Sequence, residues 1–132
     1  MTISTAVFVD SVRQRDDGGL DLCGLTEGFG FPSLPVTLEE VPLFLNLEID
    51  EQDRAQKCRI AFHLLTPSGQ QVDSENRLEF TLPGDDVPTA KLLPALNLTF
   101  HHFGIHTLEI RRDDLVLQRL HLSITRQALK NS

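Results

Sequence analysis

The chain of 132 residues has no tryptophan and no tyrosine, and aromatic residues make up only 6% of it. Carbohydrate-binding sandwiches and antibody-like binding sites depend on tryptophan and tyrosine for rigid contacts that are apolar at one end and polar at the other. The absence of both residues therefore argues against carbohydrate as the ligand.

Cysteine is scarce as well, since the chain has only Cys23 and Cys58. Two cysteines cannot build the disulfide framework of a small secreted domain, and a chain of this length buries enough surface without one. We expect both thiols to be free. We also expect Cys58 to be buried, because it alternates in phase with Ile60 and Phe62.

Long apolar runs and basic clusters are missing too. No basic region precedes an apolar stretch at the N-terminus, and no run approaches the roughly 20 residues of a membrane span. The 12 basic residues are outnumbered by 19 acidic ones, which gives a net charge of -7. Nucleic acids and anionic membranes attract clustered Lys and Arg. We therefore expect a cytoplasmic protein with no basic patch and no nucleic-acid or membrane partner.

What the chain does have is a regular alternation of apolar and polar residues. The pattern is clearest over 57–65, where Cys58, Ile60, Phe62 and Leu64 occupy every second position. Successive side chains of a β-strand point to opposite faces, so this segment is predicted to have one buried and one solvated face.

The same pattern predicts an all-β domain of about eight strands. The expected strands are 3–13, 20–26, 43–50, 57–65, 71–82, 96–101, 106–111 and 115–125. Apolar residues change phase after Leu117, which indicates a β-bulge near Gln118 or Arg119. We expect a single domain over 1–125 and a flexible tail over 126–132.

Two long connections separate these strands, over 28–42 and 83–94. Both are rich in proline, which argues against central strands there. Long connections suit strands that switch sheets, so we expect a two-sheet antiparallel β-sandwich of Greek-key, immunoglobulin-like type. The only helical turn expected is one around Thr89 to Leu93.

The segment Phe103-Gly104-Ile105-His106, followed by two alternating strands, resembles the closing hairpin of an immunoglobulin-like sandwich. His106 stands where such domains usually have a tyrosine. The whole chain also resembles a small bacterial β-sandwich family of unknown function, which brings no known catalytic residues. That resemblance rests on Ala6-Val7-Phe8-Val9-Asp10, Gly19-Leu20-Asp21-Leu22-Cys23-Gly24, Phe31-Pro32, Pro67-Ser68-Gly69 and Gly104.

Catalytic motifs are missing from the sequence. It has no Gly-x-Ser-x-Gly elbow and no glycine-rich phosphate loop. The acidic pairs Asp85-Asp86 and Asp113-Asp114 fall in predicted turns, which favour aspartate for its own backbone hydrogen bonds. We expect a non-enzymatic protein without a cofactor, a catalytic residue or a metal ligand.

The favoured interpretation is a sandwich that acts through protein contacts, with a protein partner or as a homo-oligomer. Phe29 and Phe31, in a loop rich in glycine and proline, either cover the core or form an apolar contact patch. Phe44 and Leu65 stand at nominally solvated positions, so they are candidate contact residues as well. The alternative is a small metal- or ligand-binding domain, with or without enzymatic activity, centred on His102 and His106.

Overall fold

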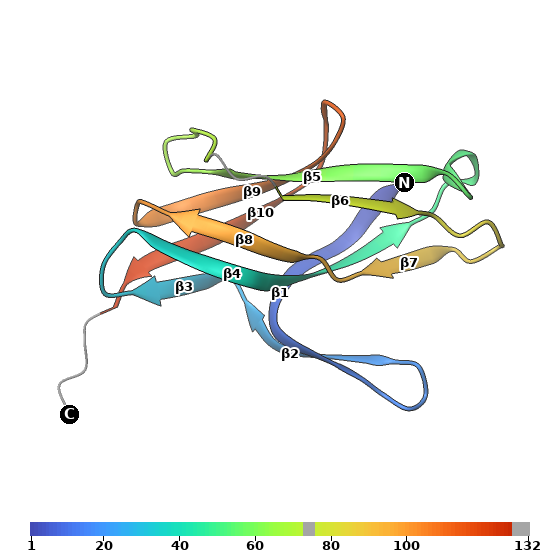
Figure 1. Cartoon of the computed structure of the whole chain (residues 1–132), viewed down its shortest axis with the longest axis horizontal. Coiled ribbons are helices and arrows are strands. Elements are labelled where there is room, and N and C mark those ends of the chain that lie inside the picture. Colours follow the sequence, from blue (N-terminus) through green and yellow to red (C-terminus); the bar gives the residue numbers. More distant parts are fainter. Residues whose placement is uncertain (73–75, 128–132) are drawn as a thin grey trace.

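Two β-sheets pack face to face in the computed structural model, which describes residues 1–72 and 76–127 (Figure 1). The strands are β1 (Thr2–Gln14), β2 (Leu20–Thr26), β3 (Gly28–Phe31), β4 (Val36–Glu48), β5 (Lys57–Leu65), β6 (Asn76–Thr81), β7 (Thr89–Leu92), β8 (Ala95–Phe100), β9 (Gly104–Arg112) and β10 (Leu115–Arg126). One short 3-10 helix, η1 (Glu51–Asp53), joins β4 to β5. The all-β sandwich is thus confirmed, with ten strands rather than about eight.

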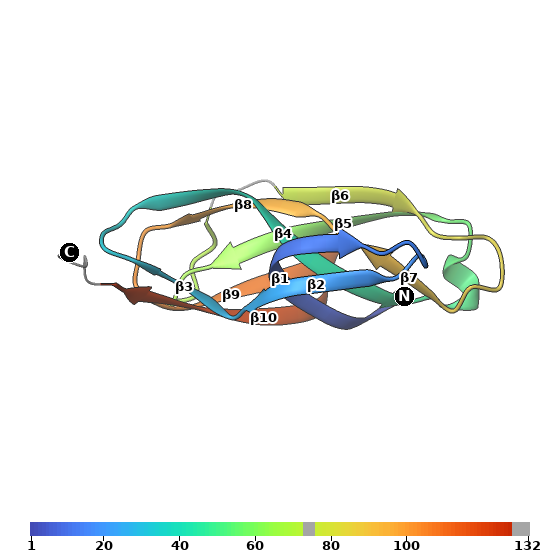
Figure 2. The ribbon, with the colours of Figure 1, turned by 90° about the horizontal axis from the view of Figure 1, so that it is seen from below.

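The first sheet has the strand order β2-β1-β4-β7, and β8 also pairs with β4. The second sheet has the order β3-β10-β9-β5-β6. All pairs are antiparallel except β3 with β10, which run parallel. Figure 1 views the two layers edge-on, with β5, β6, β9 and β10 above β8, β4 and β1, and the hairpin of β1 and β2 extends away from the sandwich; Figure 2 looks onto the first sheet.

Alternate residues of the facing strands fill the space between the sheets, as a period of two requires. The four inward residues of β5 are all buried: Cys58, Ile60, Phe62 and Leu64. Cys58 and the exposed Cys23 are both free thiols, as expected. The predicted bulge is present as well, because the register of β10 with β9 shifts between Val116 and Gln118.

The prediction of one long connection over 28–42 is wrong, because this segment forms β3 and the first half of β4. Gly28 permits the close approach of β3, since a Cβ there would collide with the carbonyl oxygen of Ser123 in β10. Pro42 is tolerated within β4 because Leu43 donates its N–H to Pro94 at 2.9 Å, so the nitrogen of Pro42 faces the opposite edge. Strand β1 pairs with that edge only from Leu43 onward.

The helical turn predicted around Thr89 to Leu93 is also wrong, because Thr89–Leu92 is strand β7. Pro88 and Pro94 flank the segment and leave too few residues between them for helical hydrogen bonds. The carbonyl oxygens of these two prolines instead accept N–H groups from β4 and the residue after it. Pro88 accepts the N–H of Ile49 at 3.0 Å. The chain passes from β6 in the second sheet to β7 in the first over residues 82–88. This part of the predicted connection therefore switches sheets, as expected.

The strand predicted over 71–82 is shorter than expected. Gln71 forms an isolated bridge with Leu65, and β6 begins at Asn76. The predicted flexible tail falls mostly on 128–132, which lie outside the described residues, as do 73–75.

Candidate interaction surface

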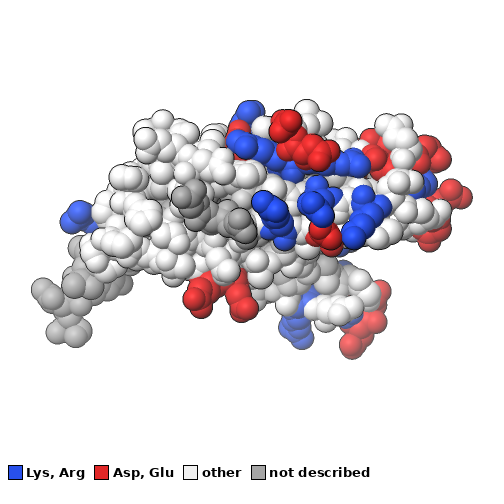
Figure 3. All heavy atoms as spheres, turned by 45° about the horizontal axis from the view of Figure 1, so that its top comes forward, with Lys and Arg blue, Asp and Glu red and all other residues white. Residues whose placement is uncertain are grey.

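The outer face of the second sheet gathers basic side chains from four strands. Strand alternation points five of them outward, while two carboxylates, Glu79 and Glu109, lie among them. We call this surface the basic face and define it by Lys57, Arg59, Arg77, Arg111 and Arg119. Figure 3 shows the corresponding grouping of Lys and Arg on one area of an otherwise mixed surface. The rest of the molecule therefore carries the acidic excess.

One end of the basic face is an exposed ion pair between neighbouring strands. The Nε of Arg59 in β5 donates to Glu79 in β6 at 2.7 Å, and Lys57 lies 3.5 Å from the same carboxylate. The two cations hold the pKa of Glu79 below its usual value, with the hydrogen bond from Arg59 as the main cause. Exposed pairs of this kind add little stability, so Lys57 and Arg59 remain available to other anions.

The centre of the basic face is Glu109, which is only 6% exposed although it stands on the solvent side of β9. Arg111 donates to one of its oxygens, and the Nε of Arg119 in β10 donates to the other at 2.8 Å. The hydrogen bond from Arg111 is the main reason that the pKa of Glu109 lies below its usual range. This network holds the guanidinium groups of Arg111 and Arg119 beside Glu109 on the outer face of the sheet.

His63 of β5 stands opposite Glu109 in the strand register. Burial, helped by the positive charge of Arg111, lowers the pKa of His63, so its imidazole is neutral at pH 7. Its Nδ1 has no hydrogen-bond partner among the described residues. Because Glu109 already accepts from two arginines, it is not free to act as a general base beside His63.

The side chains of this face are chemically suited to binding anions. Guanidinium groups bind carboxylates and phosphates through paired N–H donors, and here four of the five cations are arginines. Nucleic-acid-binding sheets add aromatic side chains on which bases stack. The outward positions of β5, β6, β9 and β10 contain no Phe, Tyr or Trp within the described ranges, so an acidic protein surface fits this face better than a single-stranded nucleic acid does.

The aromatic residues proposed for partner contact lie elsewhere. Phe29 and Phe31 stack with ring centroids 6.2 Å apart, and each ring also lies 6.3 Å from that of Phe100 in the core. Both are half-buried and cover one end of the core, which was one of the two alternatives. Phe44 is 8% exposed, and Leu65 is half-buried at the end of β5.

The two histidines of the alternative site have different surroundings. His106 is fully buried, and its Nδ1 lies 3.3 Å from the carbonyl oxygen of Gly104, whereas His102 is exposed. Gly104 has a φ of 125°, which favours glycine, and this conformation forms the predicted corner. Over the described part of the chain, no three His, Cys, Asp or Glu side chains group as metal ligands do.

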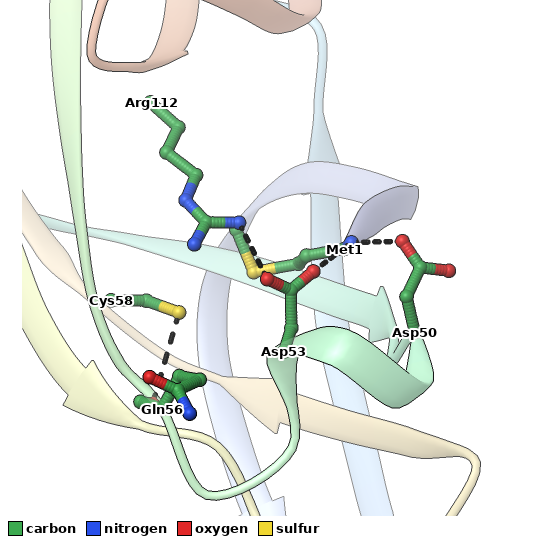
Figure 4. A network of polar contacts seen from close by, with 6 residues as sticks. All are labelled: Met1, Asp50, Asp53, Gln56, Cys58 and Arg112. Atoms are coloured by element: carbon green, nitrogen blue, oxygen red, sulfur yellow. Dashed lines mark hydrogen bonds and ion pairs between the residues drawn. The ribbon is translucent and has the colours of Figure 1, made fainter.

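A second polar network lies at one end of the sandwich, next to η1 (Figure 4). The ammonium group of Met1 lies 2.6 Å from a carboxylate oxygen of Asp53, and Arg112 donates to the other oxygen at 3.2 Å. The bond from Met1 is the main cause that lowers the pKa of Asp53. The carboxylate is satisfied within the chain, so the network ties β1, η1 and β9 together.

The sequence of these strands matches the model of a family of unknown function, DUF6941, over residues 4–125. The chain belongs to this family. The match spans β1 to β10 and confirms the resemblance to a family of unknown function. No curated protein matches the DUF6941 chain. Among the described residues, no helix has the length and apolar character needed to cross a membrane.

The basic face of this DUF6941 protein is the feature that sequence reasoning missed. The sequence shows no run of Lys and Arg, so no basic patch was expected. One signal was available, because Arg59, Arg111 and Arg119 all stand at outward positions of their strands. Their convergence follows only from the strand order β10-β9-β5-β6.

Proposed function

We propose that this protein is a non-enzymatic, cytoplasmic interaction module whose basic face binds an acidic surface of a protein partner. The observation that carries the proposal is the concentration of five basic side chains on one sheet of a chain with net charge -7. Complementary charges speed association and select the partner.

The arrangement of the second sheet supports an interaction role. Strands β5, β9 and β10 lie side by side as strands C, F and G do in immunoglobulin-like sandwiches. Such sandwiches serve many unrelated functions, so the basic face rather than the fold carries the proposal. The ion pairs of Glu109 hold Arg111 and Arg119 in place before a partner arrives, which lowers the entropy lost on binding.

The test compares two variants with the same net charge. The first replaces Lys57, Arg59, Arg77 and Arg119 with glutamine, which neutralises most of the basic face. The second replaces four exposed basic residues outside it, Arg13, Arg15, Lys91 and Arg126, with glutamine. Wild type and both variants are used for affinity purification from the native host, and retained proteins are then purified and titrated by calorimetry at two salt concentrations.

A partner that binds wild type and the second variant but not the first, with affinity that falls as salt rises, supports the proposal. Circular dichroism must show that both variants remain folded. Equal binding by wild type and the first variant contradicts the proposal. So does self-association that both variants retain, because the relevant surface would then lie outside the basic face.

A further inference from the structure

Strand β10 has a long unpaired edge beside the basic face. It pairs with β9 from Leu115 to Ile124, whereas β3 covers its other edge only from Ser123 to Arg126. No described strand pairs with that edge before Ser123. An open edge presents backbone N–H and C=O groups that can pair with another chain.

The direction of these backbone groups follows from one hydrogen bond. Ser123 donates its N–H to the carbonyl oxygen of Glu27 at 3.0 Å, on the side away from β9. Backbone groups alternate between the two edges of a strand in antiparallel pairing. The N–H and C=O of Arg119 and His121 therefore face the open edge, and those of Leu120 and Leu122 face β9.

The open edge borders a recess of about 480 Å³ between β10 and β1. Val7 and Phe8 of β1 and Leu120 of β10 supply apolar surface, and Glu27, Arg119 and His121 supply polar groups. Ile105 of β9, 62% exposed, also lines the recess. Strand β1 contacts β10 across this recess.

We propose that an extended segment of the partner adds to the second sheet as a strand along β10, in line with β3. The inference rests on the proposed function and specifies how that partner is held. Main-chain hydrogen bonds to Arg119 and His121 would supply affinity, and alternate side chains would supply specificity. Apolar residues of the segment would face Val7 and Leu120, and acidic residues would face outward beside Arg119.

The observations favour a single segment over a second copy of the whole chain. Strand β3 already occupies the same edge four residues further along, which shows that the edge accepts a parallel strand. The recess is lined by β1 on one side and by Thr26 and Glu27 where the chain enters β3. A single strand along β10 would need only the space next to this edge, whereas the edge of another sandwich would bring its second sheet against β1.

The probe is a displayed library of ten-residue peptides in which apolar and acidic positions alternate. Enriched peptides are synthesised, and amide hydrogen exchange of the full chain is measured by NMR with and without them. We expect the amides of Arg119 and His121 to exchange fast in the free protein and to become at least about tenfold slower with peptide. The amides of Leu120 and Leu122 should be protected in both states.

A pair of variants isolates the backbone contribution. His121→Pro removes one N–H from the open edge and none from the pairing with β9, whereas His121→Ala keeps that N–H. We expect His121→Pro to weaken peptide binding about tenfold and His121→Ala to bind like wild type. Methylation of alternate peptide amides provides a second test that leaves the protein unchanged. One set of methylated amides should abolish binding, and the other set should not.

The outcomes separate the two proposals. If neutralising the basic face abolishes peptide binding but Arg119 and His121 amides stay unprotected, strand addition is wrong and the proposed function stands. If these amides become protected and neutralisation has no effect, strand addition stands and the proposed function is wrong. A library that yields no binder contradicts strand addition alone, because an acidic surface of a folded partner could still bind the basic face. A wild-type dimer that His121→Pro dissociates would also contradict the addition of a partner segment, because a second copy of the chain would then occupy the edge.

Discussion

The side-chain amide of Asn76 pairs with the main chain of Asn97 and thereby joins the two sheets. Its Nδ2 donates to the carbonyl oxygen of Asn97 at 2.9 Å, and its Oδ1 accepts the N–H of the same residue at 3.0 Å. Asn76 begins β6 in the second sheet, and Asn97 lies in β8 of the first. The side chain of Asn76 thus makes the two hydrogen bonds to the backbone of β8 that a neighbouring strand would otherwise make.

Asn76→Ala is expected to lower the free energy of unfolding by about 1–3 kcal/mol, because both backbone groups of Asn97 lose their partner. Urea denaturation measures the change. Asn97→Ala is the matched control, since it keeps the main chain and loses only the exposed hydrogen bond that the N–H of Glu40 donates to the Oδ1 of Asn97. The two variants should differ clearly, and equal losses would show that the bridge between the sheets is not stabilising.

The buried ring of His106 meets Phe100 edge-on, with centroids 5.1 Å apart and an interplanar angle of 90°. His106→Ala removes this contact and the bond to Gly104, so we expect a loss of about 1–3 kcal/mol. His106→Phe should lose less, because it keeps the ring and removes Nε2, which has no partner among the described residues. Thermal denaturation should give His106→Ala the lowest melting temperature of the three proteins. An unchanged melting temperature for His106→Ala would contradict the structural role of His106.

Stability is expected to fall between pH 7.5 and 5.5. Burial is the main cause that lowers the pKa of His63 and of His106 below the usual 6.5. The unfolded chain therefore binds more protons than the folded chain below about pH 6.5. Full stability is present above that value and is lost as the pH decreases, by at most about 1.4 kcal/mol per pH unit for each histidine.

Urea denaturation at both pH values checks this dependence. His106→Phe should reduce the slope, because its side chain does not titrate. Asp53 and Glu109, whose pKa values are lowered by their cationic partners, lose their contribution only at more acid pH, below about 4. A wild-type stability that stays constant across this range would contradict the neutral state of the two histidines.

Alternation within one strand was enough to predict β5, because both its parity and its length are readable from the sequence. It was not enough for β3 and β7, which have four residues each and stand beside prolines. These short strands are held by hydrogen bonds to β10 and β4, and such long-range partners leave no local pattern.

The same limit applies to the candidate site. The outward positions of Arg111 and Arg119 could be read from each strand, but their position around Glu109 depends on the pairing of β9 with β10 and on rotamers. The parity of Glu109 places it on the outer face of the sheet, yet two arginines bury it. Parity gives the face of the sheet on which a residue lies, and neighbouring side chains decide whether water reaches it.

The pair of Glu109 and Arg119 is expected to be coupled more strongly than the pair of Glu79 and Arg59 on the same face. Glu109 is shielded from solvent, which strengthens its attraction for a cation, whereas the side chain of Glu79 is 44% exposed. Double-mutant cycles use glutamine at each position and the free energy of unfolding as the measurement. We expect a coupling of about 1 kcal/mol for Glu109 with Arg119 that changes little between 0.05 and 0.5 M salt, conditions over which an exposed pair is screened.

The coupling of Glu79 with Arg59 should be smaller and should decrease with salt. Equal couplings with equal salt dependence would mean that Glu109 does not hold the arginines in place, and the rigid anion-binding face would lose its physical basis.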